Sequence, residues 1–224
     1  MDRSAWLAER RASVVASYDA EALAYDQNEY PADTQREWVG RLLRLCPPGG
    51  IVLDAPCGTG RYFSLVAEVG LRVAGADQSA GMLARNRARG IASSLDQVAL
   101  QELSYVHEFD AVTTVDAMEN VPPEDWPGAL ANLHRAVRPG GHLYMTVEEA
   151  DQSDIDRAFE DLAAGGEPAV LGEVIEGDVA GYHYYPGRDR VLGWLAAEGL
   201  AVVDEAFKQE DGWGYRHFLL RGRS

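Results

Sequence analysis

Short apolar runs alternate with helical stretches along the middle of this 224-residue chain, and no other feature constrains its fold as strongly. The apolar runs of strand length lie at residues 51–53, 71–76, 98–100, 111–115 and 142–147. Helix-like patterns separate them, at residues 59–69, 79–89 and 124–137. Strands that alternate with helices build a parallel sheet covered on both faces, so the sequence predicts an α/β fold.

The two ends of the chain depart from this alternation. Helix-spaced apolar positions at residues 4–18 and 33–46 predict two N-terminal helices. At the other end, a helical pattern at 191–198 precedes two strand patterns, at 200–207 and 215–220. Gly212 and Gly214 lie between these two strands and predict a tight turn. We therefore expect a C-terminal hairpin whose last strand runs antiparallel to the rest of the sheet.

The amino-acid composition disfavours some classes of binding partner and some cellular compartments. The chain carries 36 acidic and 20 Lys or Arg residues, a formal net charge of -16, which disfavours binding to nucleic acid. Cys46 and Cys57 are the only cysteines, too few for a disulfide-stabilised secreted fold. The sequence shows no signal-peptide pattern and no apolar run of membrane-spanning length. We expect a cytoplasmic protein with no membrane partner. Its oligomeric state stays open.

The segment Ile51–Gly60 carries the most specific chemistry. A buried strand ends at Asp54, passes through a turn containing Gly58 and Gly60, and enters a helix. Ligands of open α/β sheets bind beyond the carboxyl ends of the strands, where this turn lies. A glycine pair alone is also compatible with an ordinary strand-to-helix turn. Seventeen residues later, Asp77 ends the next strand and is placed to accept hydrogen bonds from ribose hydroxyls. Asp77 is equally suited to cap the following helix, although Ser79 can do so instead.

Four motifs in this order resemble those of the class I S-adenosylmethionine-dependent methyltransferases that act on small molecules. They are 51–60 (IVLDAPCGTG), 75–83 (GADQSAGML), 108–121 (EFDAVTTVDAMENV) and 133–143 (LHRAVRPGGHL). The resemblance implies S-adenosylmethionine as cofactor and methyl transfer to a small molecule by in-line displacement. It also implies a Rossmann-like, seven-stranded, mostly parallel sheet with helices on both faces and a C-terminal antiparallel hairpin. We expect one domain over residues 1–224: N-terminal helical cap 1–46, cofactor-binding core 47–147, substrate-lid insert 148–190, and C-terminal helix and hairpin 191–224.

The same resemblance assigns cofactor-binding roles to residues of the motifs and the cap. These are Tyr25, Asp54, Pro56, Gly58, Gly60, Asp77, Gln78, Met82, Gln101, Glu102 and Asp116. Two positions depart from the family pattern. Pro56 stands where glycine is usual, and it removes a backbone donor. Asn120 stands where the family often has histidine, which puts in doubt any histidine-based role copied from relatives.

The acceptor is expected to bind between the N-terminal cap and the insert. The cap contains Tyr18, Tyr25 and Tyr30, and in this family such inserts commonly form a substrate lid. The cluster at 182–185 is the densest group of aromatic residues in the chain, and alternation places Tyr182 and Tyr184 opposite His183 and Tyr185. The candidate catalytic residues are His183, Tyr184 and Glu119. The candidate substrate-binding residues are Tyr18, Asn120, Glu148, Tyr182 and Tyr185.

Simpler interpretations exist for several of these residues. The aromatic cluster is also compatible with a half-buried strand that packs on the core, and Glu148 with a solvated strand end. Two other functions share part of the pattern. A nicotinamide-dependent oxidoreductase would require a third glycine at the G-x-G-x-x-G spacing after Gly58, and Phe63 occupies that position. An S-adenosylmethionine-binding protein without methyl transfer, such as a cyclase-like enzyme or a regulatory binder, would carry identical motifs. No Cys or His spacing is typical of a zinc site, so we expect no metal.

Overall fold

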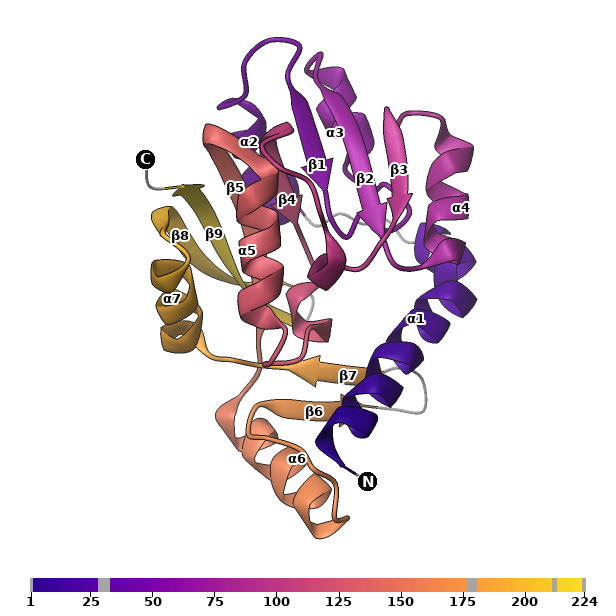
Figure 1. Ribbon diagram of the computed structural model, residues 1–224, viewed down its shortest axis with the longest axis vertical. Coiled ribbons are helices and arrows are strands. Elements are labelled where there is room, and N and C mark those ends of the chain that lie inside the picture. The colour runs from indigo at the N-terminus through magenta and orange to yellow at the C-terminus, as the bar shows by residue number, and fades with distance from the viewer. Residues whose placement is uncertain (1, 28–32, 177–180, 211–212, 223–224) are drawn as a thin grey trace.

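Seven strands form one sheet in the computed structural model, which describes residues 2–27, 33–176, 181–210 and 213–222 (Figure 1). In spatial order they are β3 (Ser94–Gln97), β2 (Arg72–Asp77), β1 (Ile51–Asp54), β4 (Phe109–Thr114), β5 (Val137–Glu149), β9 (Trp213–Gly222) and β8 (Leu200–Glu210). The first five are parallel, and β9 is antiparallel to β5 and β8. This confirms the seven-stranded, mostly parallel sheet with an antiparallel C-terminal hairpin. Gly212, part of the predicted turn, lies outside the described residues.

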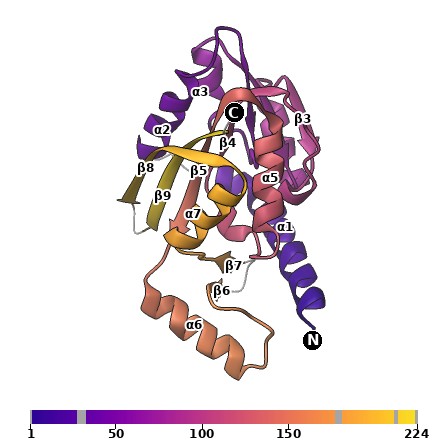
Figure 2. The ribbon, with the colours of Figure 1, turned by 60° about the vertical axis from the view of Figure 1, so that its left-hand side comes forward.

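Helices cover both faces of the sheet, as Figure 2 shows from the side. One face packs on α2 (Asp33–Leu43), α3 (Phe63–Glu68) and α4 (Ala80–Arg89), and the other on α5 (Trp126–Ala136) and α7 (Arg188–Ala197). Alternation along β1 shows why: Val52 is buried with α2, whereas the neighbouring Leu53 is buried with α5. Both faces are apolar because each is covered, which explains the continuous apolar runs of the sequence.

The remaining elements lie beyond the carboxyl ends of the parallel strands, toward which the strand arrows point in Figure 1. They are the long α1 (Arg3–Gln27), α6 (Gln152–Ala164), β6 (Glu173–Glu176) and β7 (Gly181–Tyr184). The last two form a separate antiparallel pair. Helix α6 and strands β6 and β7 lie within the predicted insert at 148–190. Helix α1 packs against α4 and β7, so the first and the last thirds of the chain meet over one edge of the sheet.

An ion-pair cluster fastens α1 to the insert. The guanidinium of Arg3 donates to both carboxylate oxygens of Glu173, at 2.6 and 2.7 Å, and to Glu124. The side chain of Glu173 is fully buried and also accepts a hydrogen bond from the Tyr182 hydroxyl at 2.7 Å. Trp6 packs edge-on against the Tyr182 ring, with centroids 6.0 Å apart. We call Arg3, Trp6, Glu173 and Tyr182 the latch.

The latch is testable by substitution of its cation. Arg3→Ala leaves the buried carboxylate of Glu173 without its counter-charge, so we expect the free energy of unfolding to fall by about 2–4 kcal/mol. The matched control is Arg157→Ala, which removes an exposed arginine that pairs only with Asp154 in the described structure and should change stability little. Chemical denaturation measures both. Equal stabilities of the two variants would show that the latch does not stabilise the fold.

Three predicted boundaries were wrong. The strand predicted at 98–100 lies instead at Ser94–Gln97, because β3 is an edge strand with exposed polar side chains and no apolar pattern. The helix predicted from Thr59 begins at Phe63, since Gly60 adopts a φ of +82° that no right-handed helix allows. The first helix extends to Gln27 rather than ending at residue 18.

The Arg138-Pro-Gly-Gly141 sequence of the fourth motif lies at a break of register inside β5. The pairing of β5 with β4 passes from Phe109–Val137 directly to Ala111–His142. Gly141 is required at this break, because a Cβ there would lie 2.5 Å from the backbone oxygen of Asp110. The Gly-Gly sequence therefore lets β5 approach β4 closely.

Candidate functional site

A cavity of about 940 Å³, counting its open mouth, lies at the carboxyl ends of β1, β2 and β4. Eleven of the predicted site residues line it: Tyr18, Tyr25, Asp54, Pro56, Gly58, Asp77, Gln78, Met82, Gln101, Asp116 and Asn120. Helix α1 forms one wall and the loop after β1 forms another. The structure therefore brings most of the predicted cofactor residues to one place.

Asp77 holds the glycine loop in position. Its Oδ2 accepts a hydrogen bond from the backbone N–H of Gly58, and its Oδ1 accepts one from Ser79, both at 2.8 Å. Ser79 caps α4, since its hydroxyl oxygen accepts from the N–H of Met82. The backbone of Gln78 also hydrogen-bonds to this carboxylate, and three donors leave at least one of its four acceptor positions open. Asp77 also lines the cavity. Burial raises the pKa of Asp77, partly offset by these backbone donors.

Asp54 presents a polar atom that the described protein does not satisfy. The side chain is 2% exposed, and its Oδ2 has no hydrogen-bond partner among the described residues. Burial, and then the charge of Asp77, raise the pKa of Asp54 well above its ordinary value. A buried carboxyl oxygen without a partner is unfavourable, so a ligand that donates a hydrogen bond would stabilise this wall. The residue thus fits a site for a ligand with amine or hydroxyl donors.

Helix α1 contributes one face to the cavity. Arg11, Val14, Tyr18 and Tyr25 line it, and their spacing of three, four and seven residues places them on the same side of a helix. Sequence reasoning missed Arg11 and Val14, although this spacing would have found them. The guanidinium of Arg61 stacks over the Tyr25 ring at 3.5 Å from the centroid and donates to the Tyr25 backbone oxygen. The end of α1 is therefore tied to the glycine loop.

Asp116 follows β4 in a conformation rarely adopted by a residue with a side chain, with a φ of +55°. Its Oδ1 accepts a hydrogen bond from the Tyr215 hydroxyl at 2.5 Å, and its N–H donates to Thr146. Burial raises its pKa. Tyr215 comes from the C-terminal hairpin, 99 residues further along the chain, and no sequence signal pointed to it.

Asn120, in the cavity wall, forms hydrogen bonds to both α1 and β7. Its Oδ1 accepts from the Tyr18 hydroxyl of α1 at 2.9 Å, and its Nδ2 donates to the Tyr182 backbone oxygen of β7 at 3.1 Å. Glu119, the preceding residue, is 4% exposed and does not line the cavity itself. Burial, and then the charges of Asp116 and Glu148, raise the pKa of Glu119 well above its ordinary value of 4.5.

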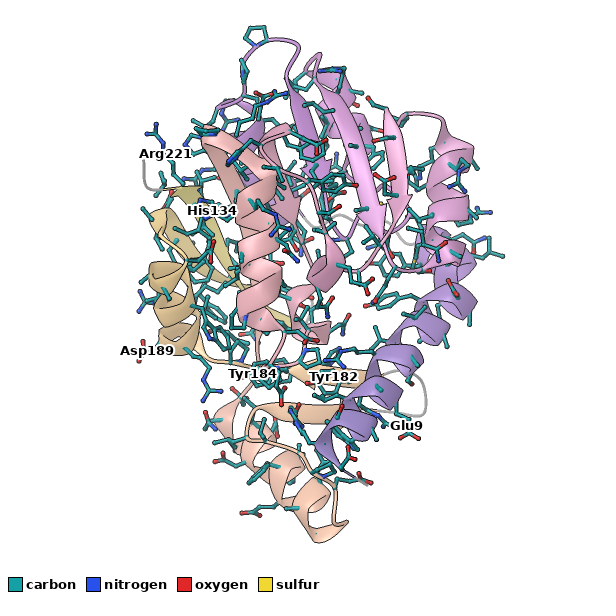
Figure 3. The ribbon with its side chains drawn as sticks, viewed as in Figure 1. Glu9, His134, Tyr182, Tyr184, Asp189 and Arg221 are labelled. Atoms are coloured by element: carbon teal, nitrogen blue, oxygen red, sulfur yellow. The ribbon has the colours of Figure 1, made fainter. Side chains whose placement is uncertain are left out.

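The aromatic cluster of the insert does not line the cavity. Figure 3 shows Tyr182 near α1 and Tyr184 nearer α7, both on β7. Both rings are buried in the main core, and Arg190 donates to the Tyr184 hydroxyl. Tyr185 packs instead in a small separate cluster. The predicted alternation along the strand is confirmed, and the simpler interpretation of a strand packed on the core describes Tyr182 and Tyr184.

His183 is half-buried, and its charge lowers the pKa of the Asp116 carboxyl, against the larger effect of burial. Its Nδ1 is 3.2 Å from the Tyr185 hydroxyl. Other predicted residues also lie apart from the cavity. Glu102 is exposed, Gly60 shapes the loop without lining the cavity, and Glu148 lines a different hollow. Tyr30 lies outside the described residues.

A methyltransferase domain family model matches residues 52–141, which include the glycine loop and Asp77. A malonyl-[acyl-carrier protein] O-methyltransferase of Yersinia pestis is 30% identical over 156 residues, covering 67% of this chain and 56% of that protein. The chain thus spans just over half the length of that relative. A ubiquinone/menaquinone biosynthesis C-methyltransferase of Shewanella is 30% identical over 175 residues, covering 73% of this chain and 68% of the relative.

Solved structures share the fold. A 1,6-didemethyltoxoflavin-N1-methyltransferase of Burkholderia thailandensis, with bound S-adenosylhomocysteine, superposes with a TM-score of 0.73 at 18% identity, covering 96% of this chain and 90% of that one. A magnesium protoporphyrin IX methyltransferase of Synechocystis with bound S-adenosylmethionine gives 0.61 at 17% identity, covering 85% and 77%. Fold, glycine loop and relatives agree on one class of enzyme. The chain belongs to the class I S-adenosylmethionine-dependent methyltransferases.

Within the described ranges, no helix is long and apolar enough to cross a membrane. The same residues contain no group of three His, Cys, Asp or Glu side chains that could hold a metal ion. Both cysteines carry free thiols, and burial raises the pKa of Cys57, which lines the cavity.

Proposed function

We propose that this enzyme transfers a methyl group from S-adenosylmethionine to a small-molecule acceptor by in-line displacement. The supporting observation is the convergence, in one cavity, of the glycine loop, Asp77 and Asp116. In this proposal, the Asp77 carboxylate binds the ribose hydroxyls, and Met82 packs on the adenine near Gln101. Asp54 and Asp116 bind beside the methionine part, where the ligand carries an ammonium group that would satisfy the buried Asp54 oxygen.

S-adenosylmethionine supplies a methyl group on a positively charged sulfur, which makes that methyl electrophilic without further activation. The protein then has two tasks, orientation and exclusion of water. Tyr18 and Tyr25 close the cavity from α1, and Asn120 holds Tyr18 in place. Correct alignment of acceptor and methyl group can contribute up to roughly 7–11 kcal/mol to the lowering of the barrier.

The acceptor side of the cavity is proposed to lie between the cap at 1–46 and the insert within 148–190. Glu119 and Asn120 are our first candidates for contact with the acceptor, since they follow β4 next to Asp116. His183 stays a candidate proton acceptor, since an imidazole exchanges a proton near neutral pH and its charge acts on Asp116. Tyr184 is assigned a structural role, because its hydroxyl is bound by Arg190 inside the core. The relatives named above act on different small or carrier-bound acceptors, so the similarity to them does not identify the acceptor of this chain.

Isothermal titration with S-adenosylhomocysteine, with NAD as control, tests the cofactor assignment. We expect a micromolar dissociation constant for the first ligand and no binding of the second, because the loop lacks the third glycine of a dinucleotide site. Transfer of a labelled methyl group to an acceptor then distinguishes an enzyme from a protein that only binds the cofactor. Binding of NAD alone would contradict the proposal.

A further inference from the structure

Asp116 occupies a demanding position in the cavity wall. It follows β4, lines the cavity and has a φ of +55°, in the left-handed region that residues with side chains rarely adopt. Such a conformation persists only where neighbouring groups hold it, and it occurs preferentially at ligand sites. The groups that hold Asp116 come from strands other than β4, so those strands can influence what the cavity binds.

Two hydrogen bonds hold Asp116 from the adjacent strands. Its backbone N–H donates to Thr146 Oγ1 on β5 at 2.8 Å, and its Oδ1 accepts from the Tyr215 hydroxyl on β9 at 2.5 Å. Tyr215 lies two positions before His217, the partner of Thr146 in the register, so Thr146 and Tyr215 lie on the same face of the sheet. The two contacts therefore fix both the main chain and the carboxylate of Asp116.

The carboxylate of Asp116 has one bound oxygen and one open oxygen. Among the described residues, the Tyr215 hydroxyl is the only group that donates to this side chain. Burial, and then the charge of Asp116, raise the pKa of the Tyr215 hydroxyl, so it stays protonated and remains a donor. Two carboxylate oxygens offer about four acceptor positions. Because Oδ1 is held by Tyr215, the carboxylate cannot rotate freely, and Oδ2 is left for a ligand in the cavity.

We propose that Tyr215 is a positioning residue, which acts through Asp116 and aims a carboxylate oxygen at the ammonium group of the methionine part of the cofactor. This inference rests on the proposed function, in which Asp116 binds beside that part. Tyr215 is not among the residues that line the cavity, so its effect on the ligand is indirect. The C-terminal hairpin thereby helps to select ligands that carry the amino-acid end over adenosine derivatives that lack it.

Two ligands distinguish positioning from a purely structural role. S-adenosylhomocysteine carries the amino-acid end, whereas 5′-methylthioadenosine keeps the adenosine and the sulfur but lacks that end. Tyr215→Phe keeps the ring and removes only the hydroxyl. It should weaken S-adenosylhomocysteine binding about three- to tenfold, the effect of one hydrogen bond, and leave 5′-methylthioadenosine binding unchanged. Isothermal titration measures both affinities. A loosened fold would instead weaken both ligands together.

A double-mutant cycle shows whether Tyr215 acts through Asp116. Asp116→Asn keeps the side-chain shape but replaces one acceptor oxygen with an NH2 group, so it should weaken S-adenosylhomocysteine binding at least as much as Tyr215→Phe. In that background, Tyr215→Phe should cause less than about a twofold further loss, because no carboxylate is left to position. The cycle uses S-adenosylhomocysteine alone, so it decides even where 5′-methylthioadenosine binds too weakly to measure.

Tyr105→Phe is the matched control. It removes a comparable hydrogen bond, from the Tyr105 hydroxyl to the Asp96 carboxylate, and neither residue lines the cavity. Both ligand affinities should stay at their wild-type values. A loss in this control equal to that of Tyr215→Phe would contradict the inference, because any lost tyrosine–carboxylate bond would then have the same effect.

The outcomes separate the two proposals. If the wild-type protein binds neither ligand, the proposed function is wrong and the inference falls with it. If Tyr215→Phe keeps its affinity for S-adenosylhomocysteine, or loses affinity for both ligands equally, the inference is overturned and the cofactor assignment stands. Additive losses in the cycle would show that Tyr215 does not act through Asp116. A Tyr215→Phe protein that fails to fold, as measured by thermal unfolding, would assign the hydroxyl to the fold and also overturn the inference.

Discussion

Asp77→Ala is expected to weaken the binding of S-adenosylhomocysteine by at least about tenfold while the protein stays folded. The variant loses the proposed ribose contacts and also the two backbone hydrogen bonds that hold the glycine loop and the start of α4. Stability should change less than affinity, because removal of a buried carboxylate of raised pKa offsets part of the lost hydrogen bonding. Calorimetry measures the affinity, and thermal unfolding measures the stability.

Asp96→Ala is the matched control for Asp77→Ala. Asp96 lies on the neighbouring strand β3, beside Ala76 in the register, but its side chain is exposed and its oxygen accepts a hydrogen bond from Tyr105 rather than from the glycine loop. The control should keep its affinity for S-adenosylhomocysteine. Unchanged affinity in Asp77→Ala would refute the ribose assignment, and equal losses in both variants would point to a general effect of charge.

Gly60→Ala is expected to destabilise the protein by about 2–4 kcal/mol and to abolish cofactor binding. Gly60 has a φ of +82°, and a Cβ there would lie 2.9 Å from the Asn86 carboxamide. That carboxamide cannot move freely, since its Nδ2 donates to Cys57 Sγ and to the Gly58 backbone oxygen. The added methyl group must therefore displace the glycine loop.

Gly70→Ala separates the steric effect from the backbone effect. Gly70 has a similar φ of +75°, but no atom lies within 4 Å of its added Cβ. Its substitution should cost only the left-handed conformation, about 1–2 kcal/mol, and should leave cofactor binding unchanged. Urea unfolding of both variants measures the difference. Equal destabilisation by Gly60→Ala and Gly70→Ala would mean that the Asn86 side chain moves aside and that the loop tolerates a side chain at position 60.

The sequence was sufficient for the parts of the fold that depend on local pattern. Strands β1, β4 and β5 are covered on both faces, so their apolar runs identified them, and the glycine-rich hairpin identified β8 and β9. The position of strand β3 was not predicted correctly, because an edge strand needs no apolar run. The length of α1 was underestimated, because its second half packs against α4 and lines the cavity rather than packing on the sheet.

The candidate site also has a part that local sequence motifs predict and a part that only the folded structure shows. The positions of Asp54, Gly58 and Asp77 around the cavity follow from short motifs, because strand, loop and helix are contiguous there. Tyr215 was beyond prediction, since only the folded hairpin brings it to Asp116. For the insert, the sequence located the aromatic cluster but not its orientation. Whether Tyr184 faces the core or a ligand depends on where β7 packs, which no local pattern states.

The latch has a consequence for how this enzyme can diversify. Arg3 and Trp6 belong to the first turns of α1, whereas Glu173 and Tyr182 belong to the insert, and the four side chains form one joint. A foreign insert grafted onto this chain would bring no partner for Arg3 and no ring for Trp6. Altered acceptor preference should therefore be transplantable only as a pair of segments, with the N-terminal helix and the insert exchanged together.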